Sequence, residues 1–234
     1  YLMLVEKSKF GKISIKNFYV RRVLRIWPLY FLILILGFFI LPNFTSIPYF
    51  SDNFTINFSE NLIFYLLILP NIAFSIYPAV PLIGQSWSIG VEEQFYLIWP
   101  LFFTFFKKFS INLLMIFLAL ILILKVLILY VYVNNQSVEW LLALKKFLAM
   151  SKFENMIIGA VGAICLLKKM KLIKLISNNI SLSISLIALI LTTIYLPNIF
   201  RDGIHIIHAL FFVVIIINIS TYDKSFIKLE KRLL

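Results

Sequence analysis

One stretch of the sequence carries two adjacent carboxylates into an apolar segment that continues to Phe106: Gln85-Ser-Trp-Ser-Ile-Gly-Val-Glu-Glu-Gln-Phe-Tyr-Leu-Ile-Trp-Pro100. A charged side chain at the centre of a membrane helix costs about 2.5–3.5 kcal/mol on insertion scales, so such a residue is a functional candidate. In a helix, spacings of three and four place polar residues on one face, and this face would hold Gln85, Ser88, Glu92 and Tyr96. Glu93 lies about 100° round the helix from Glu92, so the two carboxylates must meet different surroundings. Either residue can be a functional carboxylate or a helix N-terminal charge at the water interface; we favour the first for Glu92 and the second for Glu93.

The composition places the chain in a membrane. Of its 234 residues, 62% are hydrophobic and 14% are charged, and the mean hydropathy is +0.99. Soluble domains are only about half apolar and about a quarter charged, whereas apolar runs of ~20 residues cross the ~30 Å hydrocarbon layer of a bilayer. These values exclude an ordinary soluble domain and predict an all-α, polytopic transmembrane helix bundle. The single cysteine, Cys165, cannot form an internal disulfide.

Apolar segments alternate with polar ones along the chain. We predict six membrane crossings, over residues 27–41, 87–106, 111–133, 154–167, 175–196 and 204–220. Leu62–Tyr77 is apolar but short and is interrupted by Pro70, so we expect a re-entrant or interfacial helix whose broken backbone is shielded by protein or water. The crossing at 154–167 is rich in Gly and Ala, which allows helices to approach closely in lipid.

The distribution of positive charge sets the orientation of these crossings. Segments 6–25, 107–108, 168–174 and 224–232 hold 17 of the 22 Lys and Arg residues, and such residues gather in cytoplasmic loops. Residues 42–60 hold none, so we place them outside, and only one full crossing then fits between them and Lys107-Lys108. Residues 87–106 are the better candidate for that crossing. The net charge of +12 therefore follows from topology, and we expect no nucleic acid partner.

A cluster of arginines precedes the first crossing, in Tyr19-Val-Arg-Arg-Val-Leu-Arg-Ile-Trp-Pro28. Arg22 and Arg25 are three residues apart and share a helix face, and Arg21 lies four residues before Arg25. Guanidinium groups match phosphate oxygens in bidentate fashion, so the cluster can hold a phosphorylated soluble ligand. The alternative is anchoring at the cytoplasmic surface, which is the commoner role of a basic cluster beside a span.

Taken together, the two motifs resemble the membrane acyltransferase family 3, which includes O-antigen and peptidoglycan O-acetyltransferases. The resemblance covers most of the chain and rests on Arg22-x-x-Arg25-Ile-x-Pro28 and on Trp87-Ser-Ile-x-x-Glu92-x-Gln-Phe-Tyr96-Leu-x-x-Pro100, with a looser third pattern in Phe153-Glu154 and Ile158-Gly-Ala160. It implies ten spans, acyl transfer from cytoplasmic acyl-CoA to a sugar across the membrane, and contacts from Arg22 and Arg25 to the CoA phosphates. It also implies a catalytic histidine on a first span that these residues do not include. We therefore expect residues 1–234 to be part of one integral membrane acyltransferase domain, truncated at both ends and inactive alone.

The expected reaction uses acyl-CoA, with acetyl-CoA the expected donor, and no metal. Glu92 would orient or charge-balance the histidine that deprotonates the acceptor hydroxyl. The expected partners are membrane lipids, acyl-CoA, and an envelope polysaccharide or glycolipid, and the expected location is a bacterial inner or plasma membrane. Two other hypotheses stay open. One is a transporter or flippase with its substrate at the interrupted helix; against it, residues 1–234 show one interrupted segment and no related second half. The other is a non-catalytic subunit that binds acyl-CoA or lipid.

Three further residues have polar chemistry without an assigned role. His205 and His208 are three residues apart after Arg201-Asp202, but a zinc site needs a third protein ligand, so we predict histidines at an interfacial helix start and no metal. Lys125 lies in mid-span, where it must face the bundle or extend its charge to the interface.

Overall fold

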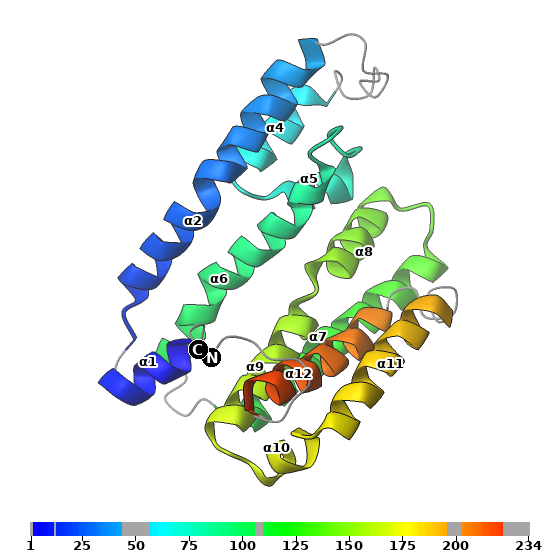
Figure 1. Ribbon diagram of the computed structural model, residues 1–234. Helices are drawn as coiled ribbons and strands as arrows, with labels where there is room; N and C mark the ends of the chain where they lie inside the picture. Colours follow the sequence, from blue (N-terminus) through cyan, green and yellow to red (C-terminus); the bar gives the residue numbers. More distant parts are fainter. Residues whose placement is uncertain (1, 12, 44–56, 106–109, 196–202, 222–234) are drawn as a thin grey trace. The chain divides into compact units, whose positions relative to one another are not determined.

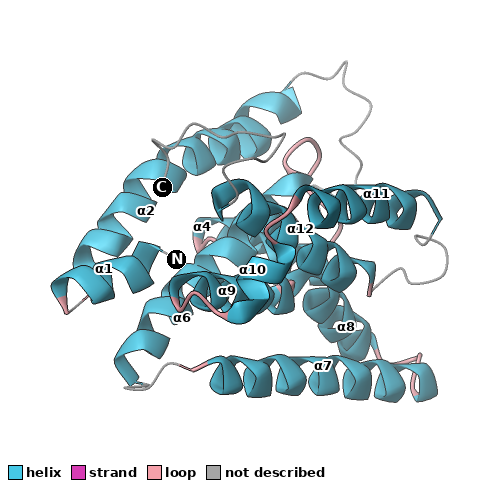
Figure 2. Cartoon of the chain, turned by 60° about the horizontal axis from the view of Figure 1, so that its bottom comes forward, coloured by secondary structure: helices cyan, strands magenta, loops and turns pink. Residues whose placement is uncertain are grey.

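A computed structural model of the chain describes residues 2–11, 13–43, 57–105, 110–195 and 203–221. In this part of the chain every regular element is a helix and none is a strand (Figure 2), so the all-α prediction is confirmed. The chain divides into two compact units. The α2–α6 unit comprises Ser14–Phe109 and Leu122–Lys152, and the α9–α12 unit comprises Tyr1–Ile13, Ser110–Ile121 and Phe153–Leu234.

The α2–α6 unit begins with its longest helical run. Helix α2 spans Ile15–Ile35 and continues through a π-helical turn, Leu36–Ile40, and a 3-10 turn, Leu41–Asn43. The other helices are α4 (Phe58–Leu66), α5 (Pro70–Ile76), α6 (Trp87–Phe105, after the 3-10 turn Gly84–Ser86), the second half of α7 (Ile111–Asn134) and α8 (Glu139–Ser151). Helices α2 and α6 run in opposite directions (Figure 1), and α5 packs against both α6 and α8.

The α9–α12 unit is organised around its last helix. Its elements are α1 (Leu2–Phe10), the first half of α7, α9 (Phe153–Leu167), α10 (Lys171–Ile176), α11 (Asn179–Tyr195) and α12 (Ile204–Thr221). Helix α12 packs against both α9 and α11 (Figure 1). The fully buried Asn218 of α12 donates from Nδ2 to the carbonyls of Ile176 and Asn178, at 2.9 and 2.6 Å. It thereby links the end of α10 and the start of α11 to α12.

Four helical runs in the described residues are long and apolar enough to cross a membrane, which supports an integral membrane protein. They are Ile15–Asn43, Ile111–Asn134, Glu139–Leu167 and Ile204–Thr221. The other two predicted crossings correspond to α11, which is shorter, and to α6, which carries Glu92, Glu93 and Gln94 through its first half. The topology with six crossings therefore stays a prediction.

The prediction of a basic loop before the first crossing was wrong. Residues 6–25 form most of α1 and the first half of α2, so the helix begins at Ile15 rather than at Trp27, and Pro28 lies in mid-helix. Lys and Arg are good helix formers, and aromatic side chains of this half pack against α6. A high density of positive charge indicates that a segment lies near water, but it does not by itself indicate that the segment is a loop.

The interrupted apolar segment consists of two short helices, as Pro70 indicated. Pro70 is the first residue of α5, where its missing N–H does no harm. Helix α4 ends in a Schellman arrangement, in which the amide of Ile68 donates to the Tyr65 carbonyl at 3.0 Å and that of Leu69 to the Phe64 carbonyl at 2.8 Å. Ile68 takes the left-handed conformation (φ +59°) that glycine usually supplies.

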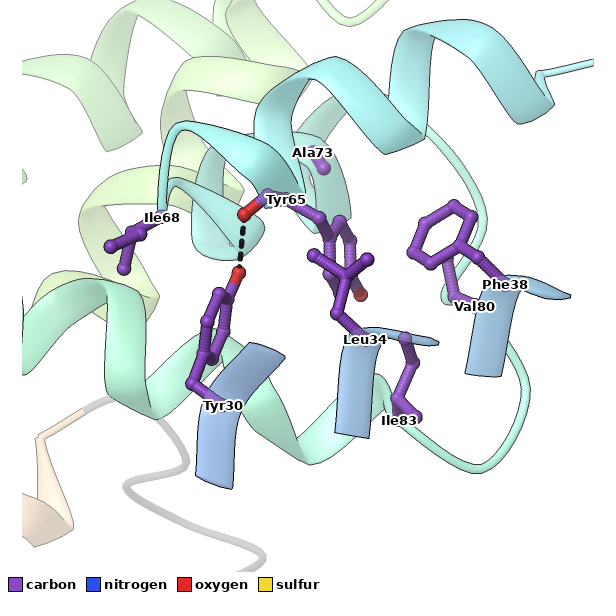
Figure 3. Close-up of a cluster of buried hydrophobic side chains, with 8 residues drawn as sticks. All are labelled: Tyr30, Leu34, Phe38, Tyr65, Ile68, Ala73, Val80 and Ile83. Atoms are coloured by element: carbon purple, nitrogen blue, oxygen red, sulfur yellow. Dashed lines mark hydrogen bonds between the residues drawn. The ribbon is translucent and has the colours of Figure 1, made fainter. Parts of the chain in front are cut away.

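The turn between α4 and α5 is covered by α2. The hydroxyl of the buried Tyr30 donates to the Tyr65 carbonyl at 2.7 Å (Figure 3), so protein shields this broken part of the backbone. The side chains around this contact form a hydrophobic cluster. Its buried members are Tyr30, Leu34, Phe38, Tyr65, Ile68, Ala73, Val80 and Ile83 (Figure 3). Burial of these side chains fixes the α4–α5 hairpin against α2.

Close packing of α9 on α12 gives a first prediction. A Cβ atom at Gly162 would lie 2.5 Å from Cγ1 of Val213, so Gly162→Ala should lower the free energy of unfolding by about 1–3 kcal/mol, as overpacked cores do. The measurement is thermal unfolding of the detergent-solubilised protein. Gly159→Ala in the same helix is the matched control, because nothing lies within 4 Å of its added Cβ. Equal effects of the two substitutions would contradict this packing.

Several predictions fall outside the described residues. Most of segment 42–60, the pair Lys107-Lys108, the loop containing Arg201-Asp202 and the basic segment 224–232 belong to ranges 44–56, 106–109, 196–202 and 222–234. The orientation inferred from positive charge depends on these ranges and stays a prediction.

Candidate functional site

The candidate site lies in the α2–α6 unit, along the line where α2 and α6 meet. Rising residue numbers on α2 face falling numbers on α6, as antiparallel helices require. The Tyr19 hydroxyl donates to the Leu97 carbonyl at 2.9 Å, and further along, the Trp27 indole Nε1 donates to Oε2 of Glu93 at 3.4 Å. These side chains set the register of the two helices.

A pocket of about 460 Å³ opens between these helices and contains the predicted site residues. It is lined by Arg22, Arg25, Ile26, Leu29, Tyr30, Ile89, Glu92 and Tyr96. The arginines and Glu92, which lie far apart in the sequence, are thus brought together. The pocket is polar toward Arg22 and Tyr96 and apolar toward Leu29, Tyr30 and Ile89, because the helices present these residues in that order.

Arg22 is held between two aromatic rings. Its guanidinium carbon lies 4.3 Å from the ring centroid of Tyr96 and 5.4 Å from that of Phe18, within the range of cation–π attraction. The two rings also meet edge to face, at 6.1 Å. A stacked guanidinium keeps its N–H donors in its own plane, so its edge is available to an anion. Arg25, one turn along α2, is exposed.

The predicted polar face of α6 is confirmed over one turn. The Tyr96 hydroxyl donates to Oε2 of Glu92 at 3.3 Å, as residues four apart in a helix can. Gln85 instead lies in the 3-10 turn before α6, where its carbonyl accepts from the Ser88 hydroxyl at 3.1 Å. The pocket is lined by Glu92 and Tyr96 but not by Gln85 or Ser88.

The two adjacent carboxylates do meet different surroundings, but not in the way we expected. Glu92 is exposed and faces the pocket. Glu93, which we favoured as a helix-terminal charge at the water interface, is half-buried against α2. Its Oε2 accepts from Trp27, and its buried Oε1 has no hydrogen-bond partner in the described part of the chain. The prediction that the two side chains point in different directions was right, but the predicted surroundings of Glu93 were wrong.

Sequence reasoning missed a pair of amides that fixes α5 against α6. Asn71 is fully buried and donates from Nδ2 to Oε1 of Gln94, while Gln94 Nε2 donates to Oδ1 of Asn71, both at 3.1 Å. Gly90 lies one turn before Gln94, where an added Cβ would be 2.6 Å from that Oδ1. Polar residues join helices in this way in membranes. The sequence did contain a signal for this contact. Gly90 and Gln94 are four residues apart, so they share one face of a largely apolar helix.

The two histidines belong to α12, in the α9–α12 unit. Nε2 of His208 lies 3.2 Å from the Thr192 hydroxyl, which joins α12 to α11. Among the described residues, no three His, Cys, Asp or Glu side chains gather closely enough to hold a metal ion. Asp202, the nearest acidic residue to His205 in sequence, lies outside the described residues.

The fold and the pocket define a class: an all-helical chain with candidate membrane spans and a pocket that combines guanidinium, carboxylate and phenol groups with an apolar end. No protein family, no curated protein and no solved structure matches this chain. The resemblance to the membrane acyltransferases therefore rests on its motif residues.

Proposed function

We propose that this chain is part of an integral membrane O-acyltransferase, which moves an acyl group, expected to be acetyl, from cytoplasmic acyl-CoA to a hydroxyl of an envelope sugar or glycolipid. One observation carries the proposal: Arg22, Arg25 and Glu92 line the same pocket. The first two provide an anion site, and the third provides a carboxylate beside it.

The polar end of the pocket suits the phosphates of the donor. Guanidinium–phosphate hydrogen bonds are charge-assisted and about twice as strong as neutral ones. Arg22 is restrained by its ring contacts, whereas the exposed Arg25 can follow the ligand. The apolar lining of Ile26, Leu29 and Ile89 would accommodate the arm that carries the thioester.

The reaction consists of one addition and one elimination. A base removes the proton of the acceptor hydroxyl as its oxygen bonds to the thioester carbonyl carbon. The C–S bond then breaks, and the CoA thiolate leaves and takes up a proton. The family resemblance assigns the base to a histidine outside these residues. Glu92 would accept a hydrogen bond from that imidazole and balance its positive charge, which is a positioning role.

The proposal includes a topology. Six crossings, with α4 and α5 as a re-entrant hairpin, would place the N-terminal end of α2 and the C-terminal end of α6 on the cytoplasmic side of a bacterial inner membrane. The opposite directions of α2 and α6 (Figure 1) support this arrangement. Acyl-CoA would then reach Arg22 and Arg25 from the cytoplasm.

Radiolabelled acetyl-CoA tests the function directly. It is given to membranes that hold the complete protein, and label is expected in an envelope glycan or glycolipid. Binding of CoA without transfer of label would favour a non-catalytic subunit. If a glycoconjugate crosses the membrane but receives no labelled acetyl group, the result would favour a transporter.

The arginines give a second prediction. A hydrogen bond to a charged group contributes about 1.5–3 kcal/mol, so loss of either guanidinium should raise the apparent KM for acetyl-CoA by about tenfold or more. We expect this for Arg22→Ala and for Arg25→Ala, measured as initial rates of acetyl transfer at varied acetyl-CoA. Arg21→Ala is the matched control, because Arg21 belongs to the same cluster but does not line the pocket. An unchanged KM in the Arg22→Ala/Arg25→Ala double variant would assign these residues to membrane anchoring.

A further inference from the structure

We propose that Tyr96 is the positioning residue of this site, because one side chain holds both charged groups. Its ring supports the Arg22 guanidinium, and its hydroxyl holds the Glu92 carboxylate. The inference rests on the proposed function and assigns two separable tasks to one residue: donor binding to the ring, and the acyl-transfer step to the hydroxyl.

The ring restricts where Arg22 can go. A free arginine side chain has about 2 kcal/mol of rotamer entropy, part of which any ligand must remove on binding. Here the guanidinium lies 4.3 Å from the Tyr96 centroid, and Phe18 approaches it at 5.4 Å. The group is therefore already oriented before an anion arrives, which reduces the ordering cost of binding.

The hydroxyl restricts Glu92 in a similar way. Glu92 is exposed, so without a partner its side chain would sample several rotamers. The bond from the Tyr96 hydroxyl to Oε2, at 3.3 Å, selects one of them. The other carboxylate oxygen, Oε1, then points in a defined direction for a donor in the pocket.

Neighbouring contacts fix Tyr96 itself. The buried Phe18 meets its ring edge to face, and Tyr19 donates to the carbonyl of Leu97, the next residue. Pro100 has no N–H to donate to the Tyr96 carbonyl four residues earlier, which loosens this turn of α6. The contacts from α2 thus hold in place the turn on which the site depends.

Three substitutions separate the two tasks. Tyr96→Phe keeps the ring, so the KM for acetyl-CoA should change little while kcat falls by about tenfold, the effect of one lost hydrogen bond. Tyr96→Leu also removes the ring, so KM should rise by about tenfold as well. Tyr96→Trp, which offers a better cation–π surface, should restore KM but not kcat. Phe102→Leu is the control for loss of an aromatic side chain from α6 outside the pocket, and neither parameter should change.

A binding measurement separates failure of this inference from failure of the proposed function. Coenzyme A is titrated calorimetrically into the detergent-solubilised complete protein. We expect Tyr96→Phe to bind like wild type, Tyr96→Leu about tenfold more weakly, and the Tyr96→Leu/Arg22→Ala double variant no more weakly than Arg22→Ala, since the two residues act through one contact. Wild-type affinity in Tyr96→Leu, or full kcat in Tyr96→Phe, overturns the role of Tyr96 and leaves the acyltransferase proposal intact. A wild-type protein that binds no coenzyme A overturns both.

Discussion

Glu92→Gln in the complete protein is expected to lower kcat for acetyl transfer by about 100-fold or more, within the range that acid–base groups contribute. Glutamine keeps the size of the side chain and can still accept the Tyr96 hydrogen bond, but it has no charge to balance an imidazolium. KM for acetyl-CoA should change much less, because the phosphates are expected at the arginines. Initial rates at saturating acceptor would measure both parameters.

Glu93→Gln is the matched control at the next residue. Glu93 bonds to Trp27 across the two helices and does not line the pocket, so its loss should affect stability and leave kcat largely unchanged. If Glu92→Gln transfers acetyl at the wild-type rate while Glu93→Gln does not, the carboxylate that takes part is Glu93, at its contact with Trp27, and not Glu92 in the pocket. If neither substitution slows transfer, no carboxylate of this pair takes part.

Gly90→Ala is expected to have the largest effect on stability. Its Cβ would lie 2.6 Å from Oδ1 of Asn71 and 2.8 Å from Cδ of Pro70. A proline ring cannot rotate away, and the amide is held by both of its bonds to Gln94. Overpacking costs about 1–3 kcal/mol, and each broken bond between membrane helices costs about 0.6–1.7 kcal/mol.

The measurement is the apparent Tm of the detergent-solubilised protein, which shifts by about 2–4 °C per kcal/mol in a chain of this size. Gly159→Ala is again the control without a neighbour. Adding Asn71→Ala to Gly90→Ala removes the nearer clash, so the double variant should lose less than the sum of the two single losses. An unchanged Tm in Gly90→Ala would mean that α5 does not pack on α6 at this residue.

The sequence predicted the helices best where an apolar run ends in polar residues. The crossings predicted at 111–133 and 204–220 correspond to α7 and α12 within one residue at each end, and Pro70 located the break between α4 and α5. The start of α2 was missed because arginines and lysines, which mark the water side of a span, were taken to mark the end of the helix. Charge indicates how deep a residue lies in the membrane, but it does not indicate where a helix begins. Here the helix already begins at Ile15 and continues through Arg22 and Arg25.

The candidate site was predictable along each helix but not between helices. Spacing alone related Arg22 to Arg25 and Glu92 to Tyr96, since helical neighbours follow from residue numbers. It did not pair Trp27 with Glu93 or Asn71 with Gln94, because such pairs depend on how two helices are aligned and rotated. Which of two adjacent glutamates faces a pocket is likewise decided by a partner helix.

Under the proposed function, Tyr30 would influence which acyl groups the pocket can admit. Its side chain lines the pocket together with Leu29 and Ile89, and its hydroxyl donates to the Tyr65 carbonyl near the end of α4. The space available to an acyl chain would then depend on α2 and also on the turn between α4 and α5, because that turn holds the Tyr30 hydroxyl. Selection for chain length would respond to substitutions at Ile68, which does not line the cavity.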